Sequence, residues 1–164
     1  MINHRANEIV IVDALQAYLS KSDRPCTVIR RNQVAKAPDY PYLSFTATTP
    51  LSEMRGTYSE AEDGSLYRDA TQIWSFTVQS DSDDEAMELG MKLSDFFTAS
   101  GINLLADKGI TVRRVTSLTA RDNLLTIQYE YRKGLDVTFG FLYSITPDAQ
   151  LSRDVIETNT FKEV

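Results

Sequence analysis

The sequence contains one cysteine, one histidine and no long hydrophobic run, and each of these absences excludes a class of protein. A single cysteine, Cys26, cannot form a disulfide within the chain, so we expect it to pack as a small apolar side chain. The longest aliphatic run covers residues 9–12, far short of the roughly 18 apolar residues of a membrane span. No basic region leads into an apolar signal core, so we expect the chain to be made and kept in a cytoplasm without contacting a membrane.

Motifs of the common catalytic and metal-binding classes are also missing. The sequence has no Walker-type loop, no G-x-G-x-x-G and no G-x-S-x-G, and His4 alone cannot complete a catalytic triad. Residues 81–85 hold four carboxylates, but Ala86 and Lys92 stand where a calcium loop of the EF-hand type needs glycine and glutamate. We therefore expect no enzyme, no metal and no cofactor.

Charge gives a further exclusion. The 17 Lys and Arg residues are outnumbered by 23 Asp and Glu residues, which gives a formal net charge of −6. A surface with this balance repels nucleic acid as a whole. The length of 164 residues with 42% hydrophobic side chains is typical of one soluble domain with one core.

What the sequence does contain is a clear strand and helix between residues 70 and 101. Trp74, Phe76 and Val78 alternate with polar residues, which predicts a strand with one buried face. Ser82-x-x-Glu85 predicts a capping box at the start of a helix, and Gly101 is the expected glycine at its end. Gly90, inside the apolar face of this helix, indicates a close approach of helix and sheet.

The other elements follow from periodicity and turn residues. Residues 5–20 are expected to form an amphipathic helix with Ile9, Val12, Leu15 and Leu19 on its apolar face. The segments expected to be extended are residues 27–30, 43–48, 110–118 with a bulge near Arg113-Arg114, and 125–141 with a bend at Gly134, while residues 119–123 have the composition of a turn. Tyrosines and phenylalanines fall in the buried phase of these strands, so core packing is their expected role. The predicted fold is α+β: a mostly antiparallel sheet with two main helices on one face.

Two segments do not fit this pattern. Residues 51–69 lose all periodicity and gather acidic residues, so we expect a long projecting acidic loop, with a hairpin as the alternative. Residues 144–164 are polar, with only Leu151, Val155, Ile156 and Phe161 as apolar anchors. The expected division is a single domain over residues 1–143 and a C-terminal arm over residues 144–164.

Three stretches of the chain resemble the neck or tail terminator proteins of tailed bacteriophages. They are residues 31–43 (from RN to PYL), 74–97 (from WSF to DFF) and 121–132 (from RDN to YEYR), and the resemblance spans roughly residues 32–141. It implies a small α+β structural virion protein, neither enzymatic nor cofactor-dependent. This protein would form a ring, expected to be a hexamer, that closes the tail tube and joins it to the head connector. Assembly would take place in the host cytoplasm.

The two unusual segments are not matched by the resemblance, but a ring of this kind would give them expected roles. Glu60, Glu62 and Asp63 would face the channel of the ring and let DNA pass without binding, although a merely solvated loop is the simpler alternative. The four apolar anchors of the arm would dock on a neighbouring subunit or connector, unless the arm folds back on its own sheet or ends in a short helix. The rival functions are a small-molecule-binding or sensor domain, which an apolar cavity with converging polar groups would favour, and then a hydrolase.

Overall fold

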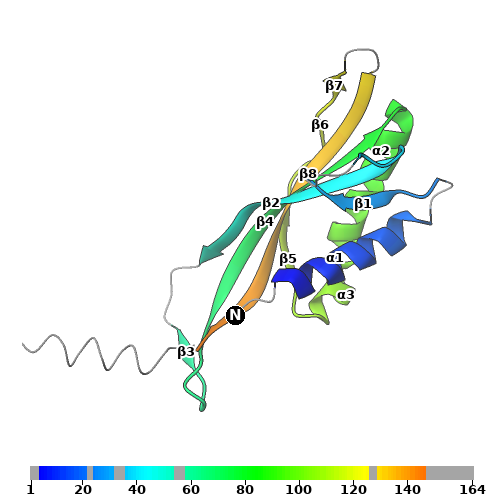
Figure 1. Ribbon diagram of the computed structural model, residues 1–164. Helices are drawn as coiled ribbons and strands as arrows, with labels where there is room; N and C mark the ends of the chain where they lie inside the picture. Colours follow the sequence, from blue (N-terminus) through cyan, green and yellow to red (C-terminus); the bar gives the residue numbers. More distant parts are fainter. Residues whose placement is uncertain (1–3, 22–23, 32–35, 54–57, 126–128, 147–164) are drawn as a thin grey trace, which may run out of the picture.

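The structure is a computed structural model that describes residues 4–21, 24–31, 36–53, 58–125 and 129–146 (Figure 1). One twisted sheet contains all the described strands, in the order β1-β2-β4-β8-β5, with the short strands β3, β6 and β7 added at its ends. Among the described strands, β1 and β2 form the only parallel pair. The strands are β1 (Thr27–Arg30), β2 (Tyr42–Glu53), β3 (Ser59–Glu60), β4 (Leu66–Ser80), β5 (Thr111–Val115), β6 (Thr119–Ala120), β7 (Asn123–Leu124) and β8 (Tyr129–Ile145).

The helices lie together on one face of this sheet (Figure 1). They are α1 (His4–Leu19), α2 (Asp83–Asp95), the π-helical turn η1 (Phe96–Ser100) and α3 (Ile102–Ala106). α2 packs on β4 and β8, and α1 packs on β1 and α2. The predicted α+β fold with helices on one face of a mostly antiparallel sheet is confirmed. No helix in the described part of the chain has the length and apolar character needed to cross a membrane.

An aromatic cluster fills the space between the helices and the sheet. Trp74, Phe76 and Phe139 on β4 and β8 are fully buried, as is Phe97 on η1. The ring centroids of Phe76 and Phe97 are 4.9 Å apart, and those of Phe97 and Phe139 are 5.6 Å apart. Aromatic pairs at these separations stabilise a core beyond the effect of the area they bury. The phenylalanines therefore pack as the sequence predicts.

The tyrosines and the first helix differ from prediction. Tyr129 is 47% exposed and lies beyond the helical layer, so core packing is wrong for this residue. In α1, Ile11 is buried with Leu15 and Leu19, whereas Ile9 is 51% exposed. The aliphatic run over residues 9–12 points around the whole circumference of the helix, so its sequence alone does not select the buried side.

The start of α2 is capped by a relay rather than a simple capping box. Ser82 Oγ accepts a hydrogen bond from the backbone N–H of Glu85 at 3.4 Å, as predicted. The Glu85 carboxylate, however, accepts from the Ser80 hydroxyl, whose oxygen in turn accepts from the Ser82 N–H at 3.0 Å. Ser80 therefore stands between Glu85 and the Ser82 N–H, which the predicted capping box would bring into direct contact.

Gly101 follows the last residue of η1, where the sequence predicts a helix end, but it is not the left-handed glycine of a C-cap motif. Its φ is −95° and the chain continues directly into α3. The left-handed glycine is Gly109, with φ 76°, where Ile110 N–H donates to Leu105 O and Gly109 N–H donates to Ala106 O. These two bonds form a Schellman motif. Gly101 is instead required by space, because a Cβ there would lie 2.6 Å from the Phe96 ring.

Gly90 marks a close approach, as predicted. A Cβ at Gly90 would lie 2.9 Å from the Leu118 side chain and 3.2 Å from Cβ of Lys133 on β8. The absence of a side chain therefore lets α2 lie directly on the sheet.

Nine of the fifteen described residues of the acidic segment over residues 51–69 lie in strands, so this part is not the expected loop. β2 continues to Glu53, and β3 pairs with the start of β4 through Ser59 with Tyr67 and Glu60 with Leu66. The hairpin alternative is therefore confirmed for residues 59–67. This end of the sheet extends past the helices (Figure 1), so no buried face imposes the alternation that would have revealed it.

The structure also differs from prediction near the two ends of β8. Residues 119–123 do not form the predicted turn, because β6 and β7 both pair with β8. β8 runs from Tyr129 to Ile145, so it includes the first two residues of the predicted arm. The bulge near Arg113-Arg114 is confirmed by the shift in register between Val112 and Arg114. The pairing of β4 with β8 stays in register through Gly134, where a Cβ would lie 2.8 Å from Arg121 Nη1, so this glycine makes room for an arginine.

Gly101→Ala tests the packing reason for this glycine. The added methyl group must displace the Phe96 ring, which is itself packed on Phe97 at 5.0 Å, so we expect a loss of about 1–3 kcal/mol in the free energy of unfolding. The measurement is chemical denaturation. Ser100→Ala, at an exposed neighbouring position, is the control and should stay within about 0.5 kcal/mol of the wild type. Equal stabilities of the two variants would contradict the packing argument.

Candidate assembly surfaces

Chemically reactive groups of the described residues have structural roles. Cys26 is fully buried, and burial raises the pKa of its thiol to about 12, so the thiol is neutral and unreactive. In the carboxylate cluster, Glu85 contacts Arg24 at 3.1 Å and Asp83 contacts Lys133 at 2.7 Å. Within the described part of the chain, no three His, Cys, Asp or Glu side chains converge as metal ligands.

One end of the sheet is a tightly built acidic hairpin. Gly64 N–H donates to Ala61 O at 3.0 Å, Ala61 N–H donates to Ser65 O at 2.9 Å, and Gly64 has φ 78°. This is the three-residue hairpin loop in which a type I turn is followed by a left-handed glycine. Asp63 strengthens the turn, because its carboxylate accepts the Ser65 N–H at 2.9 Å. The tip therefore has a fixed shape.

The tip presents three carboxylates to solvent. Glu60, Glu62 and Asp63 are all exposed. The hydrogen bond from the backbone of Ser65 lowers the pKa of Asp63, so this group is charged at neutral pH. The sequence-based choice of these residues as one acidic group is consistent with their position, whereas their channel-facing role stays a prediction.

The opposite end of the sheet contains a buried carboxylate that the sequence analysis missed. Glu130 on β8 is 2% exposed and pairs with Arg132. It also accepts hydrogen bonds from the hydroxyls of Tyr40 at 2.8 Å and Tyr42 at 3.4 Å. Burial and the bond to Glu130 raise the pKa of Tyr40 to about 12, so both donors keep their protons at neutral pH. This cluster fixes the segment before β2 against the start of β8.

A buried lysine joins three further elements at the same end. Lys133 on β8 is 4% exposed, and its Nζ lies 2.7 Å from Asp83 of α2 and 3.1 Å from Asp122 between β6 and β7. Burial lowers the pKa of Lys133, but the hydrogen bonds from Nζ to Asp83 and Asp122 outweigh it and the pKa lies above its ordinary value. The ammonium is therefore charged and holds α2 and the β6–β7 segment to the sheet.

A groove opens beside these clusters, on the face of the sheet away from the helices. Its volume is about 520 Å³. Ser44, Thr77 and Gln79 form part of its floor, since they alternate with Leu43, Phe76 and Val78 of the core. Its lining contains five basic residues and, among the described residues, no Asp or Glu: Arg30, Arg31, Lys36, Arg121 and Arg132.

Three of these arginines are already partnered. Arg30 pairs with Glu8 of α1, Arg132 pairs with Glu130, and Arg121 lies 3.1 Å from Asp136. Arg121 also donates to Ser75 at 2.8 Å and Thr77 at 3.1 Å, which holds it flat on the sheet. Arg31 directly follows Arg30, the last residue of β1. Arg31 and Lys36 are exposed and have no ion pair among the described residues.

Sequence analysis could not have found the groove, because its residues come from six separate stretches of the chain. Lys133 did leave a weak signal. It lies in the buried phase of β8 with Leu135 and Val137, where a charge needs a partner, whereas Glu130 lies in the polar phase of the same strand and gave no such signal. The four apolar anchors of the arm, Leu151, Val155, Ile156 and Phe161, lie outside the described residues.

Lys133→Met tests whether Lys133 holds α2 to the sheet. Removal of the ammonium leaves two carboxylates, both in partial contact with solvent, so we expect a loss of about 1–3 kcal/mol in the free energy of unfolding. Because the folded-state pKa of Lys133 is raised, the stabilisation is complete below its ordinary value of 10.5 and is lost as the pH rises through the raised value. The difference between variant and wild type should therefore be constant near neutral pH and shrink at strongly alkaline pH.

The measurement is urea denaturation as a function of pH. Lys108→Met, at an exposed position, is the matched control and should be close to the wild type at every pH. If the Lys133→Met protein is as stable as this control, the ion pairs of Lys133 contribute nothing to the free energy of unfolding.

The comparisons with known proteins give one match. A family model described as phage neck terminator protein matches residues 10–163, which is nearly the whole chain. Among curated proteins, none matches the sequence. The chain belongs to the phage neck terminator family, and the protein is therefore a structural component of the phage neck and of the virion.

Proposed function

We propose that this protein forms a ring that terminates the tail tube and joins it to the head connector. Membership in the neck terminator family is the observation that carries the proposal. The shape of the subunit supports it, because both ends of the sheet extend past the helices and carry dissimilar surfaces (Figure 1). Contacts between dissimilar surfaces of identical subunits repeat in one direction, and they produce a closed ring when the rotation closes.

Such a role needs a rigid body rather than a reaction centre. The 15 residues of β4 pair with β8 in unbroken register, which fixes the two ends of the subunit relative to each other. The groove does not resemble the apolar cavity of a small-molecule sensor, because its lining is largely charged and polar. The partners are accordingly other copies of this chain, the tail tube and the head connector, with DNA passing through the channel.

Ring formation is tested by light scattering and by imaging of negatively stained particles at high protein concentration. We expect closed rings of uniform size, alone or on isolated tail tubes, with six subunits. Rings of another number would correct the subunit count only. A protein that stays monomeric at every salt concentration and also leaves tail tubes bare would contradict the proposal.

The C-terminal arm is proposed to dock on a neighbouring subunit or on the connector. Because β8 pairs as far as Ile145, the informative truncation removes residues 147–164 and leaves every described strand intact. The shortened protein should keep its melting temperature within about 2 °C and fail to join heads to tails, since few anchors of its own core are lost. The measurements are thermal denaturation and an in vitro head–tail joining assay. A large fall in melting temperature would show that the arm belongs to the subunit core.

A further inference from the structure

We propose that the acidic hairpin tip of one subunit, residues 60–64, binds in the basic groove of the next copy of the chain. The inference rests on the proposed ring and identifies one of its subunit contacts. It gives Glu60, Glu62 and Asp63 a different role from the predicted channel lining, since carboxylates held by arginine and lysine no longer repel passing DNA.

The two surfaces have opposite charge. The tip carries three exposed carboxylates and, over residues 59–66, no basic residue. The groove offers Arg31 and Lys36 without ion pairs among the described residues, and Arg121 with one of its two terminal nitrogens bonded only to the hydroxyls of Ser75 and Thr77. Guanidinium and carboxylate groups form charge-assisted hydrogen bonds of about twice the strength of neutral ones.

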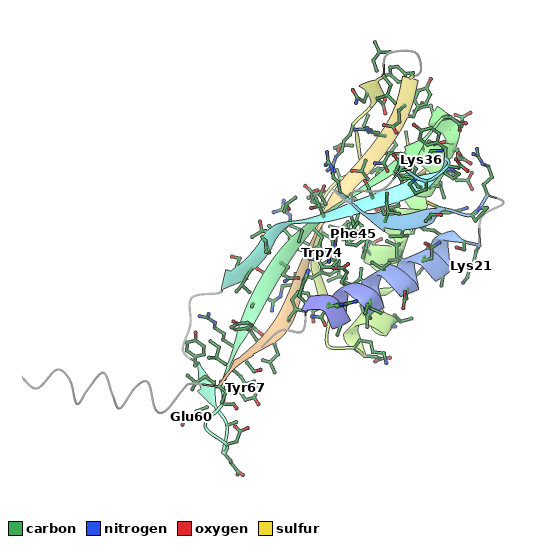
Figure 2. The ribbon with its side chains drawn as sticks, in the orientation of Figure 1. Lys21, Lys36, Phe45, Glu60, Tyr67 and Trp74 are labelled. Atoms are coloured by element: carbon green, nitrogen blue, oxygen red, sulfur yellow. The ribbon has the colours of Figure 1, made fainter. Side chains whose placement is uncertain are left out.

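A chain cannot make this contact with itself. The hairpin precedes β4 and the groove lies at the other end of the same strand, near Thr77 and Gln79. Twelve or more strand residues at about 3.3 Å each place the two surfaces roughly 40 Å apart. Figure 2 shows Glu60 and Lys36 at opposite ends of the molecule. A second copy is therefore required, and the contact is of the head-to-tail kind that generates rings.

The shape of each surface suits the other. The turn at residues 61–65 is fixed by its own hydrogen bonds, so little conformational freedom is lost when it binds. The groove volume of about 520 Å³ is within the range that encloses a ligand of a few side chains, which is the size of a hairpin tip. The floor of the groove is also rigid, because it consists of neighbouring residues on paired strands.

Nucleic acid is a weaker candidate for the groove. The chain has a formal net charge of −6, so a phosphate backbone approaching the groove meets a repulsive field over the rest of the surface. The hairpin projects past the helices of its own subunit (Figure 1), so only its three carboxylates come close to the groove, and charges farther away than the Debye length of about 8 Å are largely screened. DNA binding remains a distinct outcome of the test.

The test is reversal of charge on each surface, with the protein concentration at half assembly measured by light scattering. Glu60→Lys, Glu62→Lys and Asp63→Lys together should raise that concentration by about tenfold or more, as should Arg31→Glu with Lys36→Glu. A chain that carries both sets of substitutions should recover assembly. Attraction between exposed charges also predicts that wild-type assembly weakens as salt is added.

Matched controls separate a specific contact from net charge. Asp13→Lys, Asp95→Lys and Asp107→Lys change the net charge by the same amount on the helical layer, and all three positions are exposed. Lys108→Glu with Arg114→Glu is the corresponding control for the groove. Assembly impaired as strongly by the controls, or unimpaired by the reversals while rings still form, would overturn the docking and leave the ring standing.

Two single-cysteine additions give a direct second readout. Glu62→Cys on one copy and Lys36→Cys on another should form a disulfide-linked heterodimer under mild oxidation, while the buried Cys26 stays unreacted. Absence of this cross-link in assembled protein would contradict the contact. If the wild type instead binds a DNA duplex at physiological salt and only the groove reversal abolishes binding, the groove is a DNA site and the docking is wrong.

Discussion

The antiparallel pairing of β4 with β8 is the interaction on which the rest of this molecule depends. From Leu66 with Ile145 to Ser80 with Tyr131, the two strands stay in one register. Their middle carries the aromatic residues of the core, and their ends carry the hairpin and the buried polar clusters. Hydrogen bonds between the two strands and side-chain packing on their face support each other. The pair is therefore rigid and determines the distance between the two ends of the subunit.

The middle and the ends of this strand pair have different roles in the subunit. Hydrophobic packing under the helices stabilises the fold, and the sheet ends, which the helices do not cover, are free to carry charge. Charge is treated differently at the two ends. At one end carboxylates are exposed on a fixed turn. At the other, Glu130 and Lys133 are buried with partners, and Arg31 and Lys36 are left open to solvent. The proposed ring would use such surfaces in the contacts between its subunits.

Sequence alone predicted those parts of the fold in which a buried face makes apolar residues recur at regular spacing. The strand with Trp74 and Phe76, the helix after Ser82 and the bulge near Arg113 are all present, because a buried face filters its residues strongly. Prediction failed where that filter is absent: in the acidic hairpin, in residues 119–123, and on α1, whose four consecutive aliphatic residues point in all directions. The groove was invisible for another reason, since it is assembled from residues distant in the chain. The family was recognisable because its scaffold stretches are contiguous.

Native-state hydrogen exchange of the backbone amides tests the central claim most directly. If the β4–β8 pairing is the rigid element on which the rest of the structure depends, its amides should exchange most slowly, with opening free energies close to that of global unfolding. This protection should extend past the helical layer, to Tyr67 and Asp69 at one end and to Tyr131 at the other. Fast exchange at these ends, with protection confined to the residues under α1 and α2, would show that the ends are not held by the ladder and would contradict the account.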